Sequence, residues 1–304
     1  MRRVIRWALF PLLLASCSQE ATERTALPAR RSVPLEVVEF SGHRYVARVN
    51  VDRVFDVPLM IHGNAKLYLA VTHRVGEAVQ GHPVSKTLNY GYSSRGMGSI
   101  AVKSIRLGGE TFAGRPDIVV FDFNEGADTT VQGMLGVPFL VDARTAVDFS
   151  RDTLLLGVRQ TPEPDHSLTA QGYRCVPFSI GQDGRTALEA RFPAIGRALQ
   201  VTPSTVSGAL TLHLPLFAGK VPMTKEPSPD RSPNGTTPDE YASDSVEFEI
   251  AGVPMRSPAT FENFAEYGNV PEADLVTYGM LGFDWMKAHR AVLDYSNRRL
   301  YFLP

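Results

Sequence analysis

Histidine and acidic side chains lie close together in one early part of the chain. His62 precedes His73 by eleven residues (73 − 62), and Glu77 follows four residues later. Imidazole and carboxylate groups could act there as an acid-base pair or hold a metal ion. A metal site needs three or four closely spaced ligands, and the sequence contains no His-x-x-x-His, Cys-x-x-Cys or His-Glu-x-x-His pattern. We therefore expect neither a metal nor another cofactor.

Two aspartates and a serine are further candidates for acid-base or nucleophilic chemistry. Asp52 and Asp56 fall in VNVDRVFDVP, where they fit solvated residues at a strand turn. Ser204 has no evident base to take its proton, and no Gly-x-Ser-x-Gly sequence occurs. The glycine-rich stretch 89–98 lacks the Lys-Ser/Thr ending of a phosphate loop. None of these groups predicts a reaction by itself.

An internal repeat indicates the elements that must position such residues. Residues 133–156 and 279–302 align without a gap at an offset of 146 (279 − 133). The repeat predicts a duplicated chain, with copies at about 35–160 and 171–304. Both copies consist of short apolar or alternating runs separated by Gly and Pro, which predicts a mainly β fold. The identical positions are Gly133/Gly279, Met134/Met280, Leu135/Leu281, Gly136/Gly282, Arg144/Arg290, Asp148/Asp294, Ser150/Ser296 and Leu154/Leu300.

The end of each copy resembles the end of a lobe in pepsin-type and retropepsin-type aspartic proteases. Both have apolar-apolar-Gly, a short helical stretch and then apolar-Asp-aromatic. The resemblance implies two similar β-barrel lobes about a pseudo-two-fold axis, with short helices near 137–143 and 283–289. Asp148 and Asp294 would then be structural residues beside a terminal strand.

The resemblance also implies positions for two catalytic loops. In that family a strand turns at a glycine, and the next apolar strand runs directly into Asp-Thr/Ser-Gly. The first copy offers Ile61-His62-Gly63 and then a strand ending in Val71, Thr72 and His73; the second offers Ile195-Gly196 and then a strand ending in Val201, Thr202 and Pro203. The turns 71–74 and 201–204 should therefore meet at the base of one cleft, tied by the threonine hydroxyls. The alternative is that Val-Thr recurs by chance in two strands.

Neither of these loops contains an aspartate. The proteases activate water with two carboxylates that share one proton, and valine cannot titrate. The family's fold is therefore expected without its chemistry, and we predict no catalytic residue.

Two surface segments could contact a ligand. Residues 89–98 resemble the hairpin flap over the protease cleft, so Tyr90 and Tyr92 are candidate ligand contacts, with a solvent-facing hairpin tip as the alternative. The proline-rich stretch 218–243 falls where the second copy would build its flap. It fits either a mobile surface loop or a partner-binding segment.

The N-terminus resembles a bacterial lipoprotein signal peptide over residues 1–17. A basic start and a short apolar core precede Leu14-Ala15-Ser16-Cys17. Cys17 would carry the lipid and tether the protein to a membrane without crossing it. Ser18 favours the outer membrane, facing the periplasm. An ordinary cleaved signal peptide is the alternative.

Polar segments separate the anchor and the two copies. Residues 18–34 fit a flexible tether, and residues 161–170 fit a linker. With Cys17 lipidated, Cys175 remains unpaired, and we expect it in a buried strand. The net charge of −1 gives no basic field for nucleic acid or anionic lipid.

These features favour an exported, lipid-anchored, non-catalytic protein that binds a peptide or another ligand in a cleft between two lobes. A peptidase or other hydrolase with displaced acid-base groups is the first alternative. A structural subunit of the cell envelope is the second, and it predicts a cleft filled by side chains.

Overall fold

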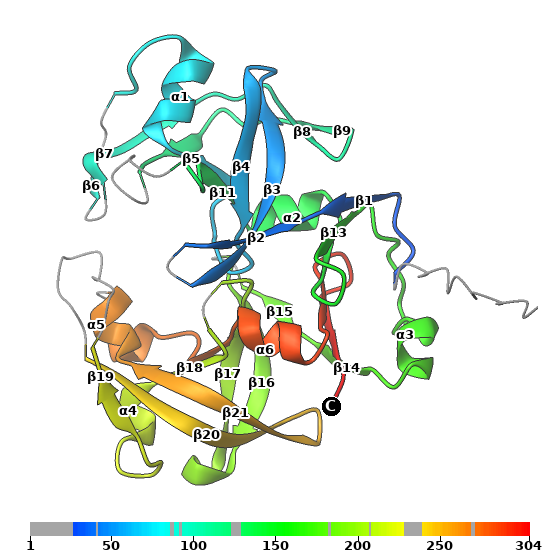
Figure 1. Ribbon diagram of the computed structural model, residues 1–304, viewed down its shortest axis with the longest axis vertical. Coiled ribbons are helices and arrows are strands. Elements are labelled where there is room, and N and C mark those ends of the chain that lie inside the picture. The colour runs from blue at the N-terminus through cyan, green and yellow to red at the C-terminus, as the bar shows by residue number, and fades with distance from the viewer. Residues whose placement is uncertain are drawn as a thin grey trace, which may run out of the picture.

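The chain is mainly β-structured, with short helices at the ends of strands (Figure 1). This computed structural model describes residues 27–40, 42–85, 88–90, 93–122, 129–181, 184–206, 208–227, 239–268 and 271–304. In these ranges no helix is long and apolar enough to cross a membrane. The α-helices are α1 (His73–Gln80), α2 (Val137–Asp142), α3 (His166–Ala170), α4 (Leu214–Phe217), α5 (Phe264–Gly268) and α6 (Phe283–Ala288).

A six-stranded sheet joins the two copies of the repeat. Its order is β1-β13-β12-β23-β24-β14, and β12 pairs antiparallel with β23 at the centre. Val147 lies opposite Leu293, the residue to which it aligns at the repeat offset of 146. The strands are β1 (Arg31–Pro34), β12 (Ala146–Asp148), β13 (Thr153–Leu156), β14 (Arg174–Pro177), β23 (Val292–Asp294) and β24 (Arg299–Phe302).

The first copy of the repeat supplies a ten-stranded sheet from strands between residues 36 and 135. It occupies the upper part of Figure 1. The strands are β2 (Glu36–Glu39), β3 (His43–Val51), β4 (Phe55–Ile61), β5 (Leu69–Val71), β6 (Leu88–Tyr90), β7 (Ser93–Ile100), β8 (Ser104–Leu107), β9 (Glu110–Ala113), β10 (Ile118–Val120) and β11 (Gly133–Leu135).

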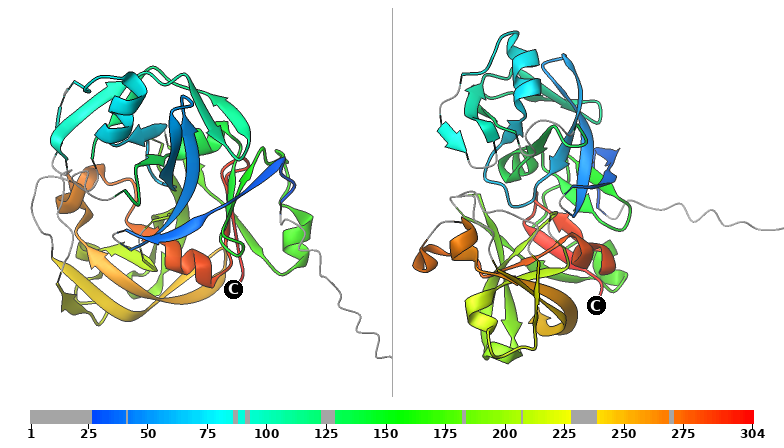
Figure 2. Two further views of the ribbon diagram at one scale, coloured as in Figure 1. Left: turned by 45° about the horizontal axis from the view of Figure 1, so that its top comes forward. Right: turned by 60° about the vertical axis from the view of Figure 1, so that its left-hand side comes forward.

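An eight-stranded sheet occupies the lower part of Figure 1, and the six-stranded sheet lies beside both larger sheets (Figure 2). Two short 3-10 helices, at Pro193–Ile195 and Glu272–Asp274, accompany it. The strands are β15 (Ser179–Ile180), β16 (Thr186–Phe192), β17 (Arg197–Pro203), β18 (Leu210–His213), β19 (Thr224–Glu226), β20 (Glu240–Ile250), β21 (Val253–Glu262) and β22 (Gly279–Leu281).

The two large sheets contain the same three-strand arrangement. β11 lies between β4, to which it is parallel, and β5, to which it is antiparallel. β22 lies in the same way between β17, which is parallel, and β18, which is antiparallel. By this pairing β17 corresponds to β4, and β18 corresponds to β5.

The expected helices after Gly136 and Gly282 are confirmed as α2 and α6. Each glycine is in an extended conformation directly before its helix. Arg144 and Arg290, two residues beyond the ends of these helices, both have positive φ angles of 49° and 47°. A left-handed residue ends a helix by turning the chain away from the helical path, so the repeat preserves a stop signal as well as a start.

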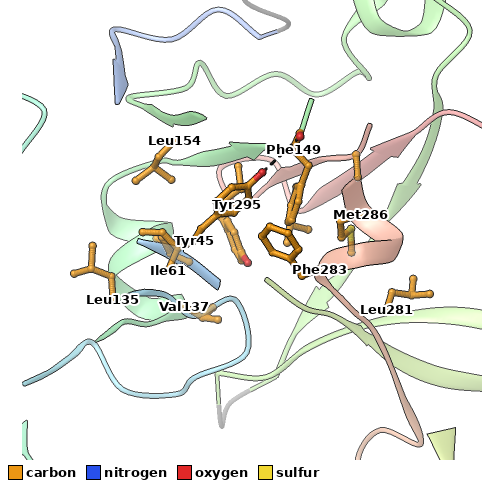
Figure 3. Packing of buried hydrophobic residues seen from close by; sticks show 14 of the residues in the cluster. Tyr45, Ile61, Leu135, Val137, Phe149, Leu154, Leu281, Phe283, Met286 and Tyr295 are labelled. Carbon is orange, nitrogen blue, oxygen red and sulfur yellow. Dashed lines mark hydrogen bonds between the residues drawn. The ribbon is translucent and has the colours of Figure 1, made fainter. Parts of the chain in front are cut away.

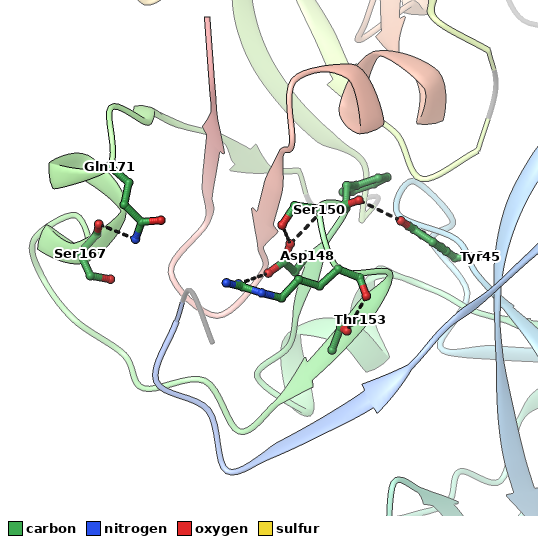
Figure 4. A network of polar contacts seen from close by, with 8 residues as sticks. Tyr45, Asp148, Ser150, Thr153, Ser167 and Gln171 are labelled. Carbon is green, nitrogen blue, oxygen red and sulfur yellow. Dashed lines mark hydrogen bonds and ion pairs between the residues drawn. The ribbon is translucent and has the colours of Figure 1, made fainter. Parts of the chain in front are cut away.

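The aspartates shared by the two copies of the repeat stabilise turns. Asp148 accepts hydrogen bonds from the backbone N–H of Ser150 (2.9 Å) and its hydroxyl (2.6 Å), and pairs with Arg151 (2.9 Å; Figure 4). Asp294 accepts from the backbone and side-chain nitrogens of Asn297 at 3.0 and 2.7 Å. Both aspartates are fully buried. Burial raises the pKa of Asp294 to about 6, with the bonds to Asn297 acting in the opposite direction.

An aromatic cluster packs the second copy against the first. Tyr45 from β3 contacts Phe283 from α6 and Phe149, with ring centroids 4.7 and 5.2 Å apart (Figure 3). The Tyr45 hydroxyl also donates to the carboxylate of Asp152, which the ammonium of Lys287 on α6 approaches to 2.5 Å. These three rings belong to one cluster of buried apolar residues that includes side chains from both copies. Large buried aromatic rings contribute strongly to the stability of such a core.

The expected tether and the expected linker both include folded segments. Leu27 is 2% exposed and packs with Val158 and Leu168, and residues 31–34 form an edge strand of the central sheet. The expected tether over 18–34 is thus wrong from residue 27 onward. The linker at 161–170 includes α3, whose N-terminal amides are capped by Asp165. Cys175 lies in β14 as expected but is only half-buried, and burial raises the pKa of its thiol.

Candidate functional site

Two loops from different halves of the chain meet at one threonine. The Thr205 hydroxyl donates to the carbonyl oxygen of Ile61 (2.5 Å) and accepts from the backbone N–H of Gly63 (2.8 Å). Ile61 ends β4 and Thr205 follows β17, so the loops leave corresponding strands. Thr205 is fully buried, and it satisfies two backbone groups that water cannot reach.

Gly63 is required by the close approach of these loops. A Cβ atom at this position would collide with the Tyr295 hydroxyl and lie 3.1 Å from the Thr205 methyl group. The Gly63 carbonyl oxygen accepts weak bonds from the hydroxyls of Tyr295 and Thr186, both at 3.4 Å. The contact therefore depends on a residue without a side chain.

His62 and Ser204 occupy matching places in the two loops. The backbone N–H of His62 donates to Leu135 of β11 (2.9 Å), and that of Ser204 donates to Leu281 of β22 (2.8 Å). Leu135 and Leu281 are equivalent in the repeat. Each side chain thus lies one residue before the point where the loops join.

The His62 imidazole is held in its neutral form. Burial, followed by the positive charge of Arg44, lowers the pKa of His62 to about 4, although the Asn64 amide acts in the opposite direction. The Nδ1 atom of His62 and the Oδ1 atom of Asn64 are both buried and make no hydrogen bond of good geometry, although the Asn64 side chain is close enough to influence the imidazole. Buried polar atoms of this kind are costly, whereas the His62 and Asn64 residues as a whole are only partly buried.

Ser204 is poorly arranged as a nucleophile. Its hydroxyl donates to the carbonyl oxygen of Val206 (2.7 Å), and the Ser204 hydroxyl oxygen accepts from the backbone N–H of Val206 (3.2 Å). The proton of Ser204 is thus directed to a backbone carbonyl. A base with a pKa of about 4, such as His62, would also remove a serine proton poorly at neutral pH. The loop segments 61–65 and 203–206 contain no carboxylate.

The structure places the expected loop residues elsewhere. Val71 lies in β5 and Val201 lies in β17, which do not correspond. The Thr72 hydroxyl bonds to the Gln132 side chain (3.2 Å), whereas Thr202 bonds to Thr277 (3.3 Å). The tie expected from Thr72 and Thr202 is instead made by Thr205. The expectation was wrong because Val71 and Val201 are fully buried within strands. The turns that contact each other are those that follow β4 and β17.

His73 and Pro203 have structural roles. His73 begins α1 and is buried against Asp122, with Nδ1 3.3 Å from the carboxylate and its own backbone N–H donating to that carboxylate at 3.0 Å. Pro203 ends β17. Among the described residues, no group of three His, Cys, Asp or Glu side chains could hold a metal ion.

The expected flap lies partly outside the described residues. Tyr90 ends β6, which pairs with β7 in a hairpin. Tyr92 lies outside the described ranges, as do residues 228–238 of the 218–243 stretch. The flanks of that stretch form the short pair β19 and β20.

A signal for the joined loops was present in the sequence. The segment Ile61-His62-Gly63 stands out as an apolar strand that runs into glycine, and Ser204-Thr205 follows a similar strand. The repeat alone could not have located both loops, because the sequence separation from the junction residue to the repeated glycine differs between the copies. It is 70 residues from Gly63 to Gly133 (133 − 63) and 74 residues from Thr205 to Gly279 (279 − 205).

Comparisons with known proteins leave the family open. No protein-family model matches the chain, and no curated protein sequence matches it. Among solved structures, the chain is similar to the crystal structure of basic 7S globulin from soybean, with a TM-score of 0.49 and 12% sequence identity. The alignment covers 91% of this chain and 95% of that chain. Similarity at this level assigns no activity and no ligand.

Proposed function

We propose that this protein is a lipid-anchored, non-catalytic member of the aspartic-protease-like fold that binds a peptide between its two halves. The observation that carries the proposal is the junction at Thr205. A threonine hydroxyl that ties two strand-following loops is the feature expected from the resemblance. The residues before the tie, where the proteases keep their acids, are His62 and Ser204.

Internal duplication is supported by equivalent hydrogen bonds. The N–H of Phe149 donates to Ala291 (2.9 Å), and the N–H of Tyr295 donates to Thr145 (3.0 Å). At the offset of 146, Phe149 is equivalent to Tyr295 and Thr145 is equivalent to Ala291, so the two bonds are equivalent. Together with the matched arrangements around β11 and β22, the bonds favour two similar lobes related by a pseudo-two-fold axis.

Loss of the reaction follows from the side chains at the junction. Neither His62 nor Ser204 can share a proton as two carboxylates do. The partly exposed imidazole of His62 and amide of Asn64 can instead bond to the N–H and C=O groups of a peptide. Binding without hydrolysis is therefore the function that these groups support best.

A hydrolase with displaced groups is the second candidate. It is favoured by one observation, the presence of an imidazole and a hydroxyl at matching positions of the joined loops. It is disfavoured by the low pKa of His62 and by the bond from Ser204 to Val206. An assay can separate the two candidates directly.

The full-length protein would be immobilised and exposed to a mixture of capped peptides, and both retained and cleaved peptides would be identified by mass spectrometry. We expect retention of intact peptides that decreases in His62→Phe and Asn64→Leu. Cleavage abolished by His62→Phe or Ser204→Ala would favour the hydrolase. Absence of both retention and cleavage would favour a structural role. Mass spectrometry of the N-terminal peptide tests lipid on Cys17.

A further inference from the structure

A pocket that shares no residue with the Thr205 junction opens beside Arg30 and Arg31, near the start of the described part of the chain. Its volume is about 420 Å³, and it lies between β1, β9 and the end of α2. Its lining is mostly charged and includes Arg30, Arg31, Glu110, Phe112, Asp142 and Arg144.

Both carboxylates of the pocket are already paired. Glu110 accepts from Arg30 (3.1 Å), and Asp142 accepts from Arg115 (2.7 Å). Within the described part of the chain, no hydrogen bond or ion pair engages the guanidinium of Arg31 or Arg144. The pocket therefore has two uncompensated positive charges, although the whole chain has a net charge of −1.

A further arginine, Arg159, lies next to the three that line the pocket. The backbone N–H of Arg159 donates to Pro28 (3.1 Å), and its neighbour Val158 donates to the carbonyl oxygen of Arg144 (2.8 Å). Arg159 is exposed. Arg159 therefore brings another exposed arginine side chain close to residues 28–31.

The distance to the proposed lipid limits where this pocket can lie. Cys17 and the buried Leu27 are ten residues apart (27 − 17). Ten residues span at most about 33–36 Å even when fully extended. A lipid on Cys17 would hold the pocket within reach of phospholipid headgroups, and guanidinium groups bind phosphate through paired N–H donors.

We propose that the pocket formed by Arg31 and Arg144 binds the phosphate of an anionic phospholipid headgroup and seats the protein on the membrane. This proposal rests on the proposed anchor at Cys17. Arg159 and the paired Arg30 extend the same basic surface. Membrane binding through one lipid group is commonly reinforced by a basic patch in this way.

The test follows arginine reactivity in the full-length lipidated protein. The protein would be placed in vesicles of phosphatidylcholine, with or without phosphatidylglycerol, and treated with phenylglyoxal. We expect modification of Arg31 and Arg144 to slow by about fivefold or more in the anionic vesicles, and high salt to restore the rate. The exposed Arg197, at the start of β17, is the internal control. In Arg31→Gln/Arg144→Gln, protection of Arg159 should also decrease.

Equal modification rates in the two kinds of vesicle would overturn the proposal. Protection by soluble glycerol phosphate alone, as strong as that by anionic vesicles, would overturn the assignment to lipid and indicate a free anion. An unmodified Cys17 in the N-terminal peptide would contradict the anchor. The arginines could then still be tested with added vesicles, so the two failures are distinguishable.

Discussion

Val147 and Leu293 face each other in the central sheet, and they are also equivalent residues of the sequence repeat. Pairing of equivalent residues places a local two-fold relation between β12 and β23. The same two-fold relation makes the hydrogen bond from Phe149 to Ala291 equivalent to the bond from Tyr295 to Thr145. The proposed duplication accounts for the contact between the loops that follow β4 and β17, since equivalent loops would approach one another near such an axis.

Thr205→Val should lower the free energy of unfolding by about 1–3 kcal/mol, because it leaves the N–H of Gly63 and the carbonyl of Ile61 buried without a partner. Urea unfolding measures the change. Thr205→Ser should retain most of the stability. Thr202→Val, which removes a longer bond to Thr277 (3.3 Å), is the matched control and should cost less. Equal losses in both valine variants would contradict the importance of the tie.

Gly63→Ala should destabilise the fold by roughly 1–3 kcal/mol, because the new Cβ collides with the Tyr295 hydroxyl. Tyr295→Phe removes that oxygen and should recover part of the loss in the double variant. Thermal unfolding of the four proteins gives the coupling free energy. Gly208→Ala controls for the backbone change, since its nearest contact would be Asp284 at 3.9 Å. Additive effects of Gly63→Ala and Tyr295→Phe would argue against the collision.

His62→Phe should change the dependence of stability on pH. Between about pH 6.5 and 4, the unfolded state protonates this histidine and the folded state does not, since its pKa is about 4 in the fold. The wild type therefore loses stability relative to His62→Phe as the pH falls, by roughly 3 kcal/mol in total. Urea titrations at several pH values measure the difference. His166→Phe controls for loss of an exposed imidazole. A constant difference would mean that His62 is not held neutral.

Asp294→Asn should change the dependence of stability on pH in the opposite direction to His62→Phe, over an overlapping pH range. Burial raises the pKa of Asp294 to about 6, so the folded state holds a proton that the unfolded state releases near 3.8. The wild type should lose stability relative to Asp294→Asn as the pH rises from about 4 to 6, by up to about 3 kcal/mol. The same titrations measure this change. A relative gain for the wild type over that range would refute the raised pKa.

His62→Asp/Ser204→Asp should create a coupled pair of carboxylates, because the two residues flank the bonds made by Thr205. One pKa should rise above about 3.9 through like-charge repulsion. Carboxylate-resolved NMR of the double variant, with each single variant as a control, measures both values. Two values unchanged from the single variants would show that the loops do not bring these positions together. Restored hydrolysis is not required.

The sequence by itself determined the features that depend on local pattern. The repeat at Gly133 and Gly279, the helices that follow it and the mainly β character could all be predicted, because turn residues and apolar periodicity act over a few neighbouring positions. The structural roles of Asp148 and Asp294 also followed from their place in the repeat.

Only the tertiary structure decided which residues lie at the junction. Val71-Thr72 and Val201-Thr202 look alike as sequence, yet they belong to strands that do not correspond. The bond between Gly63 and Thr205 joins residues 142 positions apart (205 − 63), and the low pKa of His62 arises from burial by distant segments. Local pattern carries no information on such contacts, because they depend on the register of strands that pair only after the chain has folded.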